Sequence, residues 1–260
     1  LERTPDKREV GGSSPLKPRS LSMRLRTTEY AKGFPFFMEY MWKEYPPFRY
    51  SLSDSLLFES TTWYSYWHEV PERLFEYNPH LKFIFLVKNP IDRAYSQYNM
   101  LINWRKSQLL HEYELFSDKE QLNILLKKLL DTQNFPFSYW VNQEIEKIRN
   151  QENTPIDFFP DFLHRGFYYE QLERYYQFFP VENILVIEHR ELKNNRISTL
   201  RKIEQFLNIS YVDWNTINLD DKFVSQYNVK LPSDIRNKLK AFFKPYNEKF
   251  YKLIKRNFDW

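Results

Sequence analysis

The sequence predicts an α/β fold in which helices flank a small parallel sheet. Two short apolar runs rich in β-forming residues, 81–87 and 183–187, are typical of buried strands. Segments with the apolar spacing of helices follow both runs, and strands that alternate with helices indicate a parallel sheet. The 260 residues contain no internal repeat and no sign of a second core. We therefore expect one domain over residues 29–260, after a basic tail over residues 1–28.

The tail is expected to be disordered. Residues 1–26 hold seven Lys or Arg against three Asp or Glu, several prolines, a Gly-Gly-Ser-Ser run and no aromatic residue. Such a segment offers little apolar surface to offset the entropy of ordering. A polyanion- or membrane-binding arm is the alternative, but acidic residues interrupt the basic ones. The other 234 residues carry 31 residues of each sign, and this neutral body argues against a nucleic-acid-binding module.

Helices are expected between and after the strands. The clearest helix start follows the first strand, because Asn89 can cap it, Pro90 suits its first position and Asp92 adds negative charge to its first turn. Pro245 also suits a first helical position, so the C-terminal part is expected to form two helices. The expected helices span 36–44, 90–106, 117–131, 138–149, 167–178, 196–207, 233–243 and 245–256.

Composition excludes several kinds of site. The only glycines are at 11, 12, 33 and 166, and neither a dinucleotide-binding G-x-G-x-x-G nor a phosphate loop G-x-x-x-x-G-K-[ST] fits those positions. The absence of cysteine excludes a disulfide scaffold, a thiol nucleophile and a cysteine-ligated metal. No two of the five histidines lie within five residues of each other, so we expect no metal site. The basic residues of the tail are followed by no apolar run typical of a signal peptide, and the sequence has no apolar run of 18 residues, so we expect no integral membrane segment and a cytoplasmic protein.

The end of the first strand is the most informative segment. Ligands bind α/β proteins at the carboxyl edge of the sheet, and the N-terminus of a helix there offers free N–H groups to a phosphate. Lys88 adds a cation just before the helix, and Arg93 and Ser96 share one helix face. From the residues alone, a phosphate site and a simple capped helix are equally well supported.

The segment Lys88–Tyr98 resembles the 3′-phosphate-binding segment of sulfotransferases, whose pattern is R-x-P-x-x-R-x-x-S-x-Y. The other matches follow the order found in the glycan-type branch, which includes heparan sulfate sulfotransferases and bacterial relatives. The resemblance covers about residues 29–260. The matching segments are Glu59–Tyr64, Val70–Arg73, Asn78–Lys82, Arg165–Tyr168, Pro245–Tyr251 and Phe258–Trp260.

The resemblance implies a P-loop-NTPase-like sulfotransferase fold and a donor, 3′-phosphoadenosine-5′-phosphosulfate (PAPS), that leaves as adenosine 3′,5′-bisphosphate. It implies that Ser96 binds the 3′-phosphate. Lys88 stands where the family has arginine and keeps the charge without the planar fork. Arg93 either binds phosphate or braces the helix, and Gly166 and Tyr168 shape the adenosine pocket.

The resemblance also places Glu59 at the position of the general base that deprotonates the acceptor. The family's K-x-G-T-T loop, which holds the 5′-phosphosulfate, has no match; Lys32-Gly33 is its only remnant-like pair. We therefore expect a bacterial member that lacks the first strand and this loop. Met100 replaces a histidine found in some relatives, and Val224–Tyr227 is uncharged where heparan-type enzymes carry a basic loop.

Two functions follow from these observations. The first is sulfuryl transfer from PAPS to a hydroxyl or amine, with a carbohydrate as the expected acceptor and no metal. The alternative is a catalytically impaired fragment or pseudoenzyme that only binds nucleotide or glycan.

Overall fold

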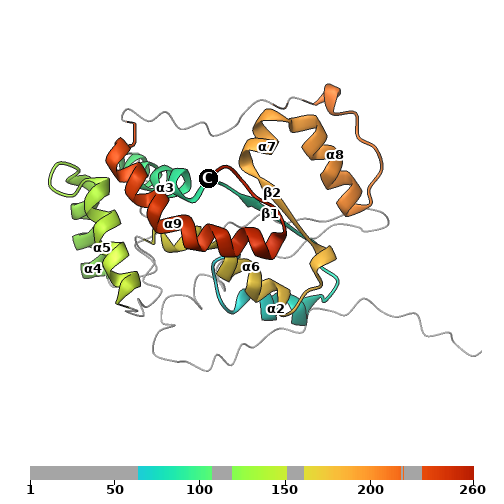
Figure 1. Ribbon diagram of the computed structural model, residues 1–260, viewed down its shortest axis with the longest axis horizontal. Helices are drawn as coiled ribbons and strands as arrows, with labels where there is room; N and C mark the ends of the chain where they lie inside the picture. The colour runs from blue at the N-terminus through green and yellow to red at the C-terminus, as the bar shows by residue number, and fades with distance from the viewer. Residues whose placement is uncertain (1–63, 107–118, 151–160, 218, 220–229) are drawn as a thin grey trace, which may run out of the picture. The chain divides into compact units, whose positions relative to one another are not determined.

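Within the described residues, two parallel strands form the sheet (Figure 1). Strand β1 spans Phe83–Val87 and strand β2 spans Ile184–Glu188, with Phe83 opposite Ile184 and Val87 opposite Glu188. The computed structural model describes residues 64–106, 119–150, 161–217, 219 and 230–260. The tail boundary at residue 28, the expected helix over 36–44 and Glu59 lie outside the described residues. The predicted small parallel sheet is confirmed.

Eight α-helices occur in the described part of the chain. The expected helix after β1 is confirmed, and the one over 196–207 has the predicted bounds. Two short helices, α2 and α7, were not predicted; α7 is held by a reciprocal capping box between Glu188 and Glu191. The helices are α2 (Val70–Tyr77), α3 (Pro90–Lys106), α4 (Lys119–Leu130), α5 (Phe137–Arg149), α6 (Tyr168–Tyr176), α7 (His189–Asn194), α8 (Arg196–Leu207) and α9 (Ser233–Ile254).

The prediction of two C-terminal helices was wrong. Helix α9 is continuous through Pro245, which lacks the N–H for one helical hydrogen bond and normally ends a helix. Leu239, Phe243, Asn247 and Phe250 are buried at helical spacing on both sides of this proline. Burial of one unbroken stripe therefore outweighs the local cost of the proline.

Helix α9 joins two apolar clusters. The first lies among α3, α4, α5 and the segment before α6; its members include Ile91, Ala94, Tyr98, Val141, Ile145, Phe162, Leu239 and Phe243. The second lies against the sheet and includes Val87, Tyr168, Leu172, Tyr175, Phe179, Ile184 and Phe250. In Figure 1 the red helix α9 runs from beside α3 to beside α6. This arrangement fixes the starts of α3 and α6 relative to the sheet.

Aromatic rings fill much of the second cluster. The Phe83 ring meets Tyr175 and Phe179 edge-on, with centroids 5.0 and 4.6 Å apart. The high aromatic content of the sequence is thus used for packing.

Strand β1 is buried on one face only. Its sequence predicted a buried strand, but Ile84 and Leu86 are 41% and 51% exposed. The alternate residues Phe83, Phe85 and Val87 belong to the cluster with α6 and α9. The pleat directs alternate side chains to opposite faces, and these helices cover one of them.

Candidate functional site

The start of α3 lies at the carboxyl edge of the sheet. Asn89 caps the helix as predicted: its Oδ1 accepts a hydrogen bond from the Ile91 N–H at 2.9 Å, and its carbonyl accepts one from the Arg93 N–H at 2.9 Å. Because β1 and β2 are parallel, α7 begins at the same edge. Helix α3 therefore directs the positive end of its dipole to the place where α/β proteins bind ligands.

Lys88 is a half-buried cation between β1 and α3. Burial lowers the pKa of its ammonium group; Asp92 opposes this, while Arg93 and Lys193 lower the pKa further. The Asp92 carboxylate that opposes this shift pairs with Arg236 at 2.8 Å. An anion bound at the start of α3 would stabilise the charged form of Lys88.

Tyr168 ties α6 to the end of β1. Its hydroxyl donates a hydrogen bond to the carbonyl of Lys88 at 2.7 Å and lies 3.3 Å from the Lys88 N–H. The tyrosine is buried, and burial raises the pKa of its hydroxyl. Tyr168, which was predicted to shape the adenosine pocket, thus positions the backbone of Lys88 through its own hydroxyl.

Gly166 permits a close contact with the first residue of α3. A Cβ at this position would lie 2.8 Å from Pro90 Cβ and 3.0 Å from Phe243 Cε1. Any side chain would push the turn His164–Gly166 away from α3. The structure therefore brings three predicted site residues together at one end of α3: Lys88, Gly166 and Tyr168.

Arg93 points into the fold. Its Nη2 donates a hydrogen bond to the carbonyl of Phe162, and burial lowers the pKa of the guanidinium. This contact fits the second of the two roles predicted for Arg93, bracing the helix. Ser96 is half-buried in the second turn of α3.

The sulfotransferase domain family matches residues 65–226, which is more than half of the chain and includes the segment around α3. The chain belongs to the sulfotransferase family. The predicted family and its fold class are thereby confirmed; the role of each site residue stays a prediction. Glu59 lies before the matched segment.

Curated relatives are 20–25% identical to this chain over the aligned residues. Heparan sulfate glucosamine 3-O-sulfotransferase 5 of Mus musculus is 23% identical, over 89% of this chain and 62% of its own length. The membrane-associated sulfotransferase kil1 of Dictyostelium discoideum is 24% identical, over 89% of this chain and 58% of its own length. The chain therefore spans only part of these relatives. Among solved structures, a sulfotransferase from Alicyclobacillus acidocaldarius is 23% identical, with a TM-score of 0.48 over 75% of this chain and 63% of its own.

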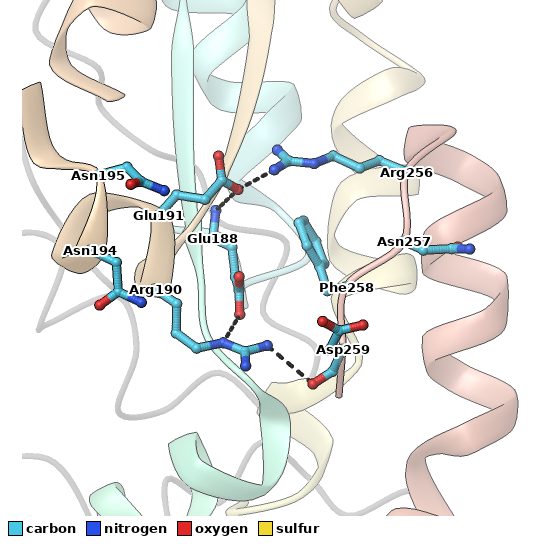
Figure 2. Close-up of a pocket in the computed structure, with 9 residues that line it drawn as sticks. All are labelled: Glu188, Arg190, Glu191, Asn194, Asn195, Arg256, Asn257, Phe258 and Asp259. Carbon is cyan, nitrogen blue, oxygen red and sulfur yellow. Dashed lines mark hydrogen bonds and ion pairs between the residues drawn. The ribbon is translucent and has the colours of Figure 1, made fainter. Parts of the chain in front are cut away.

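A shallow pocket lies at the carboxyl end of β2, between α7 and the segment after α9 (Figure 2). Its charged groups pair with one another: the Nε of Arg190 lies 2.7 Å from Glu188 Oε1, and Arg256 pairs with Glu191. The Nε1 of Trp260 also donates to Glu188 Oε1 at 2.8 Å. These contacts hold the segment after α9 against the end of β2. We therefore interpret the charged groups of this pocket as structural and not as a ligand-binding site.

A partly buried polar cluster beside α3 was not predicted. The Tyr66 hydroxyl donates to Asp161 Oδ2 at 2.7 Å and lies 3.0 Å from His164 Nδ1, and His164 Nε2 lies 3.4 Å from Glu170. Glu144 Oε1 accepts hydrogen bonds from two backbone N–H groups of the same segment. The sequence feature that could have indicated this cluster is Glu144, a charged residue on the apolar stripe of the helix predicted over 138–149.

Two further observations concern ligands and membranes. Within the described residues, no group of three or more His, Cys, Asp or Glu side chains is arranged to hold a metal ion. None of the described helices is both long enough and apolar enough to cross a membrane.

Proposed function

We propose that the chain transfers a sulfuryl group from PAPS to a hydroxyl or amine acceptor, with a carbohydrate as the acceptor class. The observation that carries this proposal is the capped start of α3 beside Lys88, within the segment matched by the sulfotransferase family. The carbohydrate acceptor is supported by relatives whose names specify heparan sulfate, at 20–25% identity.

The 3′-phosphate of the donor would lie at the start of α3. The ammonium of Lys88 and the hydroxyl of Ser96 would bind its oxygens, within the positive field at the start of the helix. This contact would hold the donor in place while its sulfur is attacked, and positioning of this kind supplies much of the rate in group transfer.

The transfer itself needs a base. The acceptor oxygen or nitrogen forms a bond to sulfur while the bond from sulfur to the phosphate oxygen breaks. The acceptor's proton passes to the carboxylate of Glu59, and adenosine 3′,5′-bisphosphate leaves.

A second candidate function is binding of nucleotide or glycan without transfer. One observation favours it: the guanidinium of Arg93, a candidate phosphate ligand, is bonded to the carbonyl of Phe162. A transfer assay with PAPS and a heparan-type acceptor distinguishes the two functions.

Lys88→Ala and Ser96→Ala should each weaken binding of adenosine 3′,5′-bisphosphate. A charge-assisted hydrogen bond contributes about 1–3 kcal/mol, so we expect Kd to rise about 5- to 150-fold in calorimetric titrations. Lys147→Ala, at an exposed position on α5, is the control and should leave Kd unchanged. Unchanged affinity in both site variants would remove the phosphate assignment.

A further inference from the structure

Arg93 and Glu144 hydrogen-bond to opposite sides of one peptide unit. The guanidinium of Arg93 donates to the carbonyl of Phe162. The N–H of Leu163 belongs to the same peptide unit and donates to Glu144 Oε1 at 2.8 Å. The next N–H, that of His164, donates to the same oxygen at 2.9 Å. The peptide between Phe162 and Leu163 thus links Arg93 to Glu144 and is polarised by both.

Glu144 is buried without a direct counterion. Glu144 is only 8% exposed, and in the described part of the chain its Oε2 has no hydrogen-bond partner. Arg93 Nε is likewise buried without a partner there. An isolated buried carboxylate is costly unless nearby charges stabilise it. The charge state of Glu144 therefore depends on its neighbours.

The neighbours of Glu144 act in opposite directions. Burial is the largest cause that raises the pKa of Glu144 to about 8, and Asp161 raises it further. The N–H groups of His164 and Leu163 and the charge of Arg93 lower it. The Tyr66 hydroxyl, which is bonded to Asp161, also interacts with the charge of Glu144, and the guanidinium of Arg165 lies 4.5 Å from the centre of the Tyr66 ring. A change in the electrostatic field at Arg93 should therefore shift the pKa of Glu144.

We propose that Glu144 is a positioning residue of the nucleotide site, and that binding of a phosphate at the start of α3 favours its neutral form, with net proton uptake from solution. The proposal rests on the proposed function. Arg93 lies in the first turn of α3, next to the candidate phosphate position. A bound phosphate dianion offsets the positive field of Arg93, which removes stabilisation from the Glu144 carboxylate and favours its neutral form.

The neutral form keeps the local structure. A protonated Glu144 still accepts both backbone hydrogen bonds through Oε1. The turn His164–Gly166 then stays in contact with Pro90, and the phosphate position is preserved. Glu144 thereby links solution pH to nucleotide affinity without a rearrangement of the backbone.

The test is calorimetry of adenosine 3′,5′-bisphosphate binding at pH 8, in two buffers of different ionisation enthalpy. At this pH the phosphates of the ligand are already fully ionised, since their second pKa is about 6, so the measured uptake reports on the protein. We expect wild type to take up a fraction of a proton for each nucleotide bound, because the pKa of Glu144 is raised to about 8 and part of its carboxyl is therefore ionised at this pH. Glu144→Gln should take up fewer protons than wild type, because only the contribution of Lys88 would remain. The control, Glu146→Gln at an exposed position on the same helix, should retain the wild-type uptake.

The outcomes separate this inference from the proposed function. Bisphosphate binding without proton uptake in wild type, or equal uptake in wild type and Glu144→Gln, would overturn the role of Glu144 alone. No binding in wild type would overturn both proposals. If Glu144→Gln fails to fold, the wild-type affinity still decides: proton uptake requires Kd to rise as pH increases from 7.5 to 9, and a flat profile would contradict it.

Discussion

Glu59→Gln should abolish sulfuryl transfer and leave the affinity for adenosine 3′,5′-bisphosphate unchanged. The amide cannot accept the acceptor's proton, and loss of a general base slows a reaction by about 10²- to 10⁴-fold. The rate would be measured as transfer of labelled sulfate from PAPS to a heparan-type acceptor, and the affinity by calorimetry.

The control for this variant is Glu69→Gln, an exposed carboxylate just before α2. It should transfer at the wild-type rate. Turnover retained in Glu59→Gln would remove Glu59 as the base. A parallel loss of nucleotide binding would show that Glu59 supports the fold of the site.

Gly166→Ala should both destabilise the protein and weaken nucleotide binding. The added Cβ would meet Pro90, a rigid ring at the start of α3, and Phe243, which is completely buried. Overpacking of this kind costs about 1–3 kcal/mol, and we expect the free energy of unfolding in urea to fall by that amount. Because Pro90 opens the helix that would bind the phosphate, the affinity for bisphosphate should fall as well.

A double variant tests the cause. Phe243→Leu removes the ring atoms Cε1 and Cζ that the new Cβ of Gly166→Ala would meet at 3.0 and 3.3 Å. The combined variant should therefore be less destabilised than the sum of the single variants. Additive losses would show that Phe243 does not limit the space at Gly166.

Local signals made parts of the fold predictable. Helix α3 begins as predicted because Asn89 and Pro90 act through their own backbone neighbours. The prediction of a helix start at Pro245 was wrong because it used a local preference alone. Packing along all of α9 overrides that preference. The exposed face of β1 was also missed, because the sequence gives the apolar content of a strand but not which of its faces is covered.

The candidate site was predictable in part. Family patterns marked Lys88, Gly166 and Tyr168, and the structure places all three around the start of α3. The link from Arg93 to Glu144 was not predictable, because it depends on a peptide unit 69 residues away from Arg93 along the chain. Contacts of this kind are set by tertiary packing.

The most direct test of a 3′-phosphate site at the start of α3 is titration of the purified chain with adenosine 3′,5′-bisphosphate, with 5′-AMP as the control. We predict that the bisphosphate binds at least about tenfold more tightly, because the 3′-phosphate adds charge-assisted hydrogen bonds worth more than about 1.4 kcal/mol. Equal affinity for the two nucleotides, or no binding in a sample that unfolds cooperatively, would contradict the assignment of this site.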